Sequence, residues 1–469
     1  MLRKNEYQEV NRMYGIYNTN KKIIQIESKE YFYYENDKYV ICYDGHIKTK
    51  NPFEEKVGCF DWREIFIDTF LLIRFDKITG NLLISQHLFG NGKNIYFIKK
   101  SDELIFASSL NELKRIADIP FELNVAMLSY YFYNGFLPGS HTLIKGVQKL
   151  EAGVCLRIDG SFIQKENIPL NSKSVEAESE SLAERYKSVL SESIFSEVND
   201  IEEPVSIALS GGYDSNCILF SIKKLWPSKK INAFSIGGIN GIDETKVASQ
   251  IAEMYQSVQF FSALVTPDTL KHLDEIVCIL EGTVYERGIF LQYELAKLMK
   301  SHSIHNLICG ECADQVFHQN TYNRIPENTF LYGYLDTPCQ MATYVVLKKS
   351  RLIMEAFGID TRYPFLTPGM IDIGYETRFI NGSSKEFHKT QCKEILPQKV
   401  LELISKQGGS TDLSSLFYGN ISNLLEKRKY YSSSFRITGK YCKEEAIRDY
   451  YLSLLYLESF EKQFCDIPT

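Results

Sequence analysis

Six consecutive residues, SGGYDS at 210–215, combine two hydroxyls, two glycines and a carboxylate directly after an apolar run, Val205–Leu209. A helix-like stretch, SNCILFSIKKL, begins at the last of them. A loop of small residues between a strand and a helix N-terminus can bind an anion, because its backbone N–H groups point at the ligand. The residues that we expect to bind phosphate oxygens are Ser210, Gly211, Gly212 and Ser215.

A carboxylate beside phosphate groups needs a cation between them. Asp214 occupies that place in the loop, and Mg²⁺ suits it because this ion binds one or two carboxylates together with phosphate oxygens. A second small loop, GECAD at 310–314, follows another apolar run and supplies Asp314. No Gly-Lys-Ser/Thr follows the glycines at 211–212, so this is not the Walker A pattern. A glycine-rich turn without a ligand remains the alternative interpretation.

The elements around the two loops alternate between strand and helix patterns from about Glu203 onward. Apolar strands VSIAL, INAFSI and HNLIC are interleaved with helix-like stretches such as ETKVASQIAEMYQ. This alternation predicts a doubly wound parallel sheet. Ligands of such sheets bind at the carboxyl ends of the strands, where both small loops lie.

The front of the chain has a different pattern, with a series of short strand candidates that begins with KKIIQIES and YFYYEN and ends with LIFASS. Turn residues such as Asn36-Asp37 separate several of them. A polar, Ser/Glu-rich stretch then predicts a linker. The predicted division is a domain at 1–165, a linker at 166–185 and a second domain at 186–469.

The bulk composition limits the class of protein. The chain has 469 residues and a net charge of −6, which does not indicate a general nucleic-acid or membrane-surface binder. The N-terminus lacks the apolar segment of a signal peptide, and no apolar stretch is long enough to span a bilayer. The 11 cysteines are scattered, which favours reduced thiols and a cytoplasmic location.

The ordered motifs resemble the asparagine synthetase group. These motifs are SIALSGGYDS, NAFSIGG, LICGECADQVF and TRYPFLTPGMID, followed by a lysine before Gln-Gly-Gly. In the front part, FLLIRFDKITGNLLISQHLFGNGKNIYF and GFLPGSHTLIKGVQKLEAG resemble that group's glutaminase-type domain. The resemblance implies an α+β and α/β fold. An N-terminal Ntn-hydrolase-like β sandwich with helices would precede a C-terminal doubly wound parallel sheet of the adenine-nucleotide α-hydrolase type.

The resemblance also implies a mechanism, in which a carboxylate attacks the α-phosphorus of ATP and an amine then displaces AMP to form an amide. The implied nucleotide-binding residues are Leu209, Ser210, Gly211, Gly212, Asp214, Ser215, Ile236, Cys309 and Gly310. Asp214 and Asp314 would bind Mg²⁺, Glu311 would serve the incoming amine, and Lys406 would stabilise charge near the adenylate. Lys385, Lys389 and Lys393 lie nearby in the sequence, so the choice of lysine stays open.

The front domain departs from the group at the residues that hydrolyse glutamine. The group's glutaminases begin Met-Cys-Gly-Ile, whereas this chain has Met13-Tyr14-Gly15-Ile16, with twelve residues before Met13. A phenol with a pKa of about 10 does not replace an activated thiolate. The glutamine-binding Asn-Gly-Glu corresponds to Asp44-Gly45-His46, and an Arg-Asp pair corresponds to Gln86-His87. We therefore expect a front domain that is retained for structure and does not hydrolyse glutamine.

Without ammonia from glutamine, the attacking amine is either free ammonia or part of the substrate. The second case describes the β-lactam synthetases and the lasso peptide cyclases, and ADQVFHQ (313–319) and YPFL (363–366) look more like the cyclase branch. The substrate would then be a peptide with a free N-terminal amine and an Asp or Glu side chain, delivered by a leader peptidase or a leader-binding protein. An ammonia-dependent synthetase acting on a small carboxylate, and a nucleotide-binding scaffold without turnover, remain alternatives. The CxxC at Cys309–Cys312 could also be redox-active or half of a zinc site, although no second ligand pair completes it.

Overall fold

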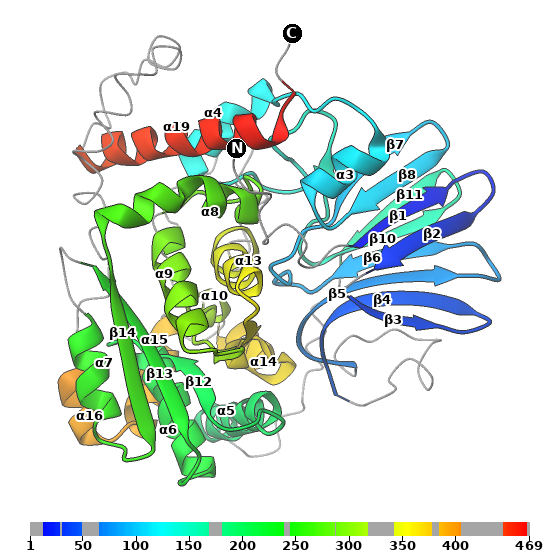
Figure 1. Ribbon diagram of the computed structural model, residues 1–469. Coiled ribbons are helices and arrows are strands. Elements are labelled where there is room, and N and C mark those ends of the chain that lie inside the picture. Colours follow the sequence, from blue (N-terminus) through cyan, green and yellow to red (C-terminus); the bar gives the residue numbers. More distant parts are fainter. Residues whose placement is uncertain are drawn as a thin grey trace.

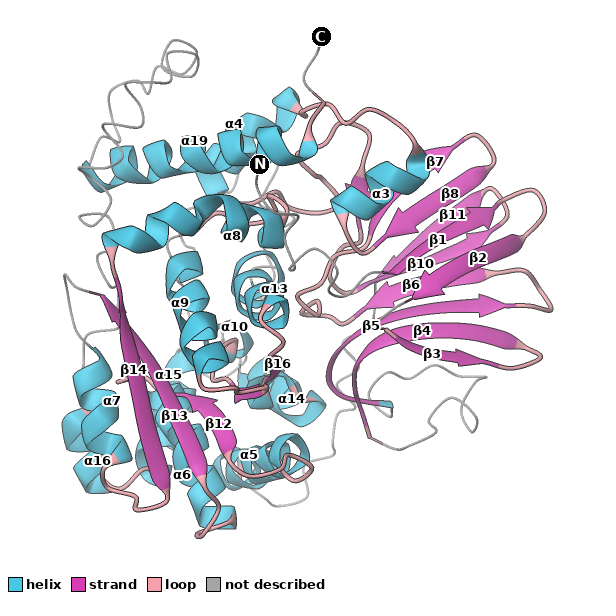
Figure 2. Ribbon diagram, in the orientation of Figure 1, coloured by secondary structure: helices cyan, strands magenta, loops and turns pink. Residues whose placement is uncertain are grey.

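The computed structural model describes residues 13–28, 31–48, 65–167, 181–238, 244–286, 288–317, 342–377, 384–404 and 444–466. Two antiparallel sheets form the N-terminal part, and a parallel sheet with helices forms the C-terminal part (Figures 1 and 2). The predicted fold class is therefore confirmed. Among the described residues, no helix is long and apolar enough to cross a bilayer.

The N-terminal sheets pack face to face around a core that includes Tyr17, Ile73 and Phe106. The five-stranded sheet, in the order β2-β1-β8-β7-β9, consists of β1 (Met13–Asn18), β2 (Ile23–Ser28), β7 (Tyr96–Lys100), β8 (Glu103–Ala107) and β9 (Gln148–Lys149). The six-stranded sheet, in the order β11-β10-β6-β5-β4-β3, consists of β3 (Phe32–Glu35), β4 (Tyr39–Ile47), β5 (Phe66–Asp76), β6 (Leu82–Gln86), β10 (Val154–Asp159) and β11 (Phe162–Asn167).

Strand β5 shows how this sandwich joins the rest of the molecule. Successive side chains of a strand point to opposite faces, and β5 is apolar on both. Leu71 and Ile73 enter the sandwich core, whereas Phe70 and Leu72 belong to a core shared with the C-terminal part. The six-stranded sheet is thus covered on both sides, and its second cover is the synthetase-like part of the chain.

The C-terminal sheet is parallel and has the order β14-β13-β12-β15-β16. Its strands are β12 (Val205–Ala208), β13 (Ile231–Gly238), β14 (Val258–Val265), β15 (Asn306–Ile308) and β16 (Asp360–Arg362). The chain first adds strands on one side of β12 and then returns to add β15 and β16 on the other side. The carboxyl ends of β12 and β15 therefore flank a topological switch point, the usual place for a ligand in such sheets.

Helices cover the sheets and connect the two parts. They are α3 (Leu110–Ala117), η2 (Val125–Met127), α4 (Leu128–Asn134), α5 (Leu182–Val198), α6 (Tyr213–Leu225), α7 (Glu244–Ala252), η3 (Pro267–His272), α8 (Leu273–Leu280), α9 (Gly288–Ser301), α10 (Ala313–Val316), η4 (Ala342–Leu347), α13 (Lys348–Ala356), η5 (Pro364–Leu366), α14 (Pro368–Glu376), α15 (Ser384–Ile395), α16 (Gln398–Leu403) and α19 (Glu444–Phe464). Helix α5 begins with a capping box formed by Ser181 and Glu184. Helix α19 lies beside α8 and α4 (Figure 1), where Tyr131 and Tyr456 share one core.

Candidate functional site

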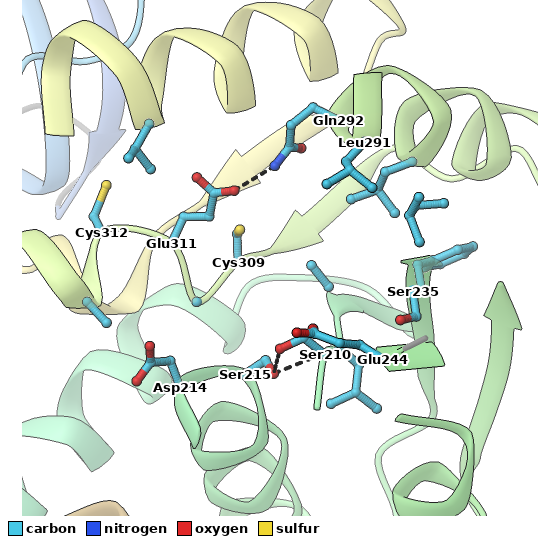
Figure 3. A pocket seen from close by; sticks show the side chains of 18 of the residues that line it. Ser210, Asp214, Ser215, Ser235, Glu244, Leu291, Gln292, Cys309, Glu311 and Cys312 are labelled. Atoms are coloured by element: carbon cyan, nitrogen blue, oxygen red, sulfur yellow. Dashed lines mark hydrogen bonds between the residues drawn. The ribbon is translucent and has the colours of Figure 1, made fainter. Parts of the chain in front are cut away.

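A pocket of about 450 Å³ lies at the switch point. The sequence-predicted residues that line it are Leu209, Ser210, Asp214, Ser215, Ile236, Cys309, Gly310, Glu311 and Asp314 (Figure 3). Gly211 and Gly212 belong to the same loop without lining the pocket. Lys406 lies outside the described residues. The structure thus brings together side chains from three strand ends that are up to about a hundred residues apart.

The first loop is held in shape by its own hydroxyls. Ser215 Oγ accepts a hydrogen bond from Ser210 N at 3.1 Å, and Ser210 Oγ accepts one from Gly212 N at 3.1 Å. Asn216 Nδ2 donates to the carbonyl groups of Ser210 and Gly212. Gly212 is the N-cap of α6, and no side chain caps this helix. The N–H groups of its first turn are therefore available to an anion.

The second loop approaches the first closely. A Cβ atom on Gly310 would lie 3.2 Å from Ser215 N, so only glycine fits there without a shift. Two residues further on, Cys312 has a φ of +70°, in the left-handed region that L side chains rarely adopt. Cys309 and Cys312 are buried free thiols. The glycine at 310 is thus explained by the close approach of the two loops.

Glu311 presents a carboxylate to the pocket. Its Oε1 accepts a hydrogen bond from Gln292 Nε2 at 2.6 Å (Figure 3). Its Oε2 is buried and has no hydrogen-bond partner within the part of the chain that the structure describes. Burial raises the pKa of Glu311, and the ammonium of Lys349, which also lines the pocket, opposes this shift. Lys349 in turn forms an ion pair of 3.0 Å with Glu286. A carboxylate with a raised pKa and an unused oxygen atom suits a group that accepts a proton from substrate.

The two aspartates converge on one cation, the ammonium of Lys385 on α15. Lys385 Nζ lies 3.0 Å from Asp214 Oδ2 and 2.5 Å from Asp314 Oδ1, and its side chain is only 6% exposed. Burial alone would lower the pKa of Lys385, but the two carboxylates raise it. Carboxylate oxygens from two loops around one positive charge also fit Mg²⁺. Lys385 is therefore a buried member of the site and not a solvated lysine.

His388, one turn further along α15, is a second contact that the sequence did not indicate. Its Nε2 lies 2.7 Å from Asp214 Oδ1, and its Nδ1 lies 2.8 Å from the hydroxyl of Tyr186. Burial would raise the pKa of Asp214, but Lys385 and His388 together hold it well below its usual range. Asp214 is thus kept ionised, as a phosphate-side metal ligand must be.

In the front domain, Tyr14 occupies the position of the group's nucleophilic cysteine, and its contacts are those of a structural residue. Tyr14 lies in β1, and the Arg115 guanidinium stacks over its ring at 5.3 Å. The sidechain hydrogen bond to Glu27 and burial raise the pKa of the Tyr14 phenol. A phenol that is harder to ionise than usual cannot act as the nucleophile that the group's cysteine provides.

Asp44 takes part in a buried ion network between the two parts of the chain. By the resemblance, it corresponds to the glutamine-binding asparagine of the asparagine synthetase group. Asp44 Oδ1 accepts from Lys93 Nζ at 2.7 Å, and Oδ2 accepts from Arg351 Nη2 at 3.0 Å. Asn91 Nδ2 also donates to it, and Glu355 lies 3.1 Å from Lys93. Arg351 and Glu355 lie on α13, whereas Asp44, Asn91 and Lys93 belong to the sandwich. These side chains therefore serve as a junction between the two parts.

Comparisons with known proteins agree with this architecture. Residues 55–167 match the family described as glutamine amidotransferase domain, and residues 185–338 match the family described as asparagine synthase. A provisionally named asparagine synthetase (glutamine-hydrolyzing) 2 of Methanocaldococcus jannaschii is 23% identical over 56% of this chain and 51% of its own length. A provisionally named asparagine synthetase (glutamine-hydrolyzing) of Mycobacterium bovis is also 23% identical, over 70% of this chain and 50% of its own. The chain thus spans about half the length of the curated relatives it matches.

Among solved structures, NMN synthetase from Francisella tularensis covers 62% of this chain and 99% of its own, with 13% identity and a TM-score of 0.27. A TM-score this low supports no argument about fold or function. The chain is thus similar to the glutamine amidotransferase domain over residues 55–167 and to asparagine synthase over residues 185–338, in this order. The branch within that group is a separate question, which the matches do not address.

Proposed function

We propose that this protein is an ATP- and Mg²⁺-dependent ligase that activates a substrate carboxylate as an acyl-adenylate and joins it to an amine of the same molecule. AMP and pyrophosphate are released, and the substrate is a peptide that closes into a macrolactam. The observation that carries the proposal is the convergence of Asp214 and Asp314 on one cation beside the uncapped N-terminus of α6. That arrangement suits the charge of a triphosphate, which a metal ion and a helix terminus both stabilise.

In this mechanism, each group of the pocket has one task. The loop at 210–215 binds the pyrophosphate portion of ATP, and Ile236 with Cys309 and Gly310 flanks the adenosine. Asp214 and Asp314 would hold Mg²⁺, which would supply positive charge against the transferring nucleotidyl group. Glu311 accepts a proton from the substrate ammonium, so that the amine can attack the acyl-adenylate. Lys406 stays a candidate for stabilising charge on the adenylate.

The source of the amine follows from the front domain. Tyr14 stands in place of the nucleophile, and Asp44 is engaged in the junction with α13, so we do not expect this chain to release ammonia from glutamine at that site. An amine on the substrate itself removes the need for ammonia. A leader peptidase or leader-binding protein that delivers the processed peptide is the partner that such a reaction requires.

A pyrophosphate-release assay with three sets of substrates tests the proposal. We expect AMP and pyrophosphate from a peptide with a free N-terminal amine and an internal Asp or Glu, and a product lighter by one water molecule in mass spectrometry. The same peptide with an acetylated N-terminus is the matched control and should give no ring. The relatives are named as asparagine synthetases, so a second candidate is amidation of a small carboxylate. With Tyr14 in place of the nucleophile, that reaction would use free ammonia. Turnover with aspartate and ammonium but not with any peptide would establish that second candidate instead.

A substitution of Glu311 separates the two chemical steps. In Glu311→Gln, we expect amide formation to fall at least about 100-fold because the proton acceptor is lost. Exchange of labelled pyrophosphate into ATP, which reports adenylation alone, should stay within about threefold of the wild-type rate, since Glu311 does not contact the phosphates in this scheme. Glu253→Gln, an exposed change of the same kind, is the control.

The pH profile gives an independent check on Glu311. A base works in its ionised form, so amide formation by the wild-type protein should be lost as the pH falls through the pKa of Glu311, which burial places above the ordinary value. This acidic limb should vanish in Glu311→Gln. Equal losses of adenylation and amide formation in that variant would instead assign Glu311 a structural role.

A further inference from the structure

A second group of titratable side chains lies far from the nucleotide pocket, where the six-stranded sheet meets the C-terminal part. His46 on β4, Asp68 on β5 and Glu197 on α5 each offer a ligand atom, and these atoms all lie within 4.8 Å of one another. His46 Nδ1 lies 3.2 Å from Asp68 Oδ1, and His46 Nε2 lies 3.1 Å from Asp360 Oδ2 on β16. Two sandwich strands and two elements of the synthetase-like part thus meet at one imidazole.

The pairing between β4 and β5 is irregular at this histidine. Gly45 pairs with Phe70 and Ile47 pairs with Phe66, so β5 carries the extra residues, and Asp68 lies in that irregular stretch opposite His46. Gly45 has a φ of +135°, and a Cβ atom there would lie 2.6 Å from the carbonyl oxygen of Thr69. A bulge interrupts the hydrogen-bond ladder and re-aims side chains. Here the irregular stretch of β5 contains Asp68, whose carboxylate contacts the imidazole of His46.

Two of the carboxylates in this group are buried without adequate partners. Asp68 and Glu197 are both 0% exposed. Neither oxygen atom of Glu197 has a hydrogen-bond partner among the described residues, and neither has Asp68 Oδ2. The nearby Arg362 donates to the backbone carbonyl of Glu197 and to the side chain of Asp200, not to the Glu197 carboxylate. Buried carboxylates are normally paired, hydrogen-bonded or bound to a metal.

The position of Glu197 in its helix adds to the energetic cost of burying its carboxylate. It lies in the last turn of α5, where the helix dipole disfavours a negative charge. A carboxylate that is buried, lies at the end of a helix and has no hydrogen-bond partner among the described residues calls for a cation at this place.

We propose that His46, Asp68 and Glu197 form a binding site for a divalent transition-metal ion, with Zn²⁺ as the best match. An imidazole nitrogen with two carboxylates is a ligand set of zinc, whereas Mg²⁺ prefers oxygen ligands alone. Bonds of about 2.0–2.2 Å place the ligand atoms of tetrahedral zinc about 3.4 Å apart, so modest side-chain movements suffice.

Asp360 has a supporting role in this site. It contacts His46 Nε2, so it can accept the Nε2 proton and leave the Nδ1 lone pair directed toward Asp68. A carboxylate behind a metal-binding histidine is a common way to fix its orientation and tautomer. Ligands from β4, β5 and α5 would then tie the sandwich to the synthetase-like part.

Zinc uptake by the full-length protein tests the proposal without any assay of catalysis. Protein stripped with a chelator is equilibrated with Zn²⁺, and bound metal and melting temperature are measured with and without the ion. We expect about one equivalent at this site and a zinc-dependent rise in melting temperature. In Glu197→Gln, zinc affinity should fall at least about tenfold, since even the loss of a supporting contact costs that much.

Glu197→Gln is also informative about folding. Glutamine resembles the neutral acid in shape, so this variant should be at least as stable as the wild type when no metal is present. His46→Ala should lose the same equivalent of zinc. Cys392→Ser is the matched control, because Asp214, His388 and Cys392 form another group that could bind zinc. The proposal is supported if one equivalent of zinc still binds to Cys392→Ser but no longer binds to Glu197→Gln. No uptake by the wild type, or uptake unchanged in Glu197→Gln, overturns it.

Discussion

Replacement of Asp214 by asparagine is expected to weaken binding of Mg²⁺-ATP at least about 100-fold, because one ligand of the metal loses its charge. The fold should survive this change. Lys385 keeps its 2.5 Å contact with Asp314, and the asparagine side chain can still accept a hydrogen bond from His388. Nucleotide binding by titration calorimetry measures the effect without knowledge of the carboxylate substrate.

A comparison with and without Mg²⁺ separates the metal from other effects. If Asp214 acts through the ion, the affinity gained by adding Mg²⁺ should be much smaller in Asp214→Asn than in the wild type. Asp268→Asn, an exposed residue in η3, is the matched control and should behave like the wild type. An undiminished Mg²⁺ effect in Asp214→Asn would contradict the assignment of this residue as a ligand.

The second large effect is expected on stability, from Asp44→Ala. Lys93 and Arg351 are 6% and 4% exposed, and they share two carboxylate partners, Asp44 and Glu355. Without Asp44, two buried cations would share one carboxylate, and breaking a buried ion network in this way typically costs about 3–5 kcal/mol. Urea denaturation should therefore show a large drop in midpoint for this variant.

A control variant and a pH dependence test whether the loss of stability in Asp44→Ala comes from the buried ion network. Asp159→Ala removes an exposed partner of Lys22 and should cost less than about 1 kcal/mol. Although burial raises the pKa of Asp44, Lys93 and Arg351 hold it below its ordinary value. The stabilisation by Asp44 is thus present at neutral pH and lost as the pH falls through the folded-state pKa. A stability difference between the wild type and Asp44→Ala that persists unchanged in acid would argue against this explanation.

The parallel sheet and its two loops could be predicted from the sequence because their signals are local. An apolar run followed by SGGYDS specifies a strand, a tight turn and a helix start within eleven residues, and the alternation of such units specifies the sheet. The phosphate-binding role of Ser210 and the metal-binding role of Asp214 were predicted from the loop itself, whereas the role of Glu311 came from the resemblance. The structure adds that all three share one pocket with Asp314.

The contacts made by α15 could not be predicted in the same way. Lys385 and His388 meet Asp214 across more than 170 residues of sequence. Nothing in SKEFHKTQCKEI distinguishes the buried Lys385 from the exposed face of the same helix, because a single amphipathic pattern does not state what the buried side contacts. The junctions at Asp44 and His46 have the same origin. Each joins strands of the sandwich to elements some 300 residues later.

The ammonium of Lys385 has a consequence for the protein before any nucleotide arrives. Two like-charged aspartates on separate loops would repel one another and spread the strand tips, but a tethered positive group holds them at the spacing they need. The entropic cost of ordering the two loops is thus partly incurred during folding, so the nucleotide binds to a site that is already preorganised.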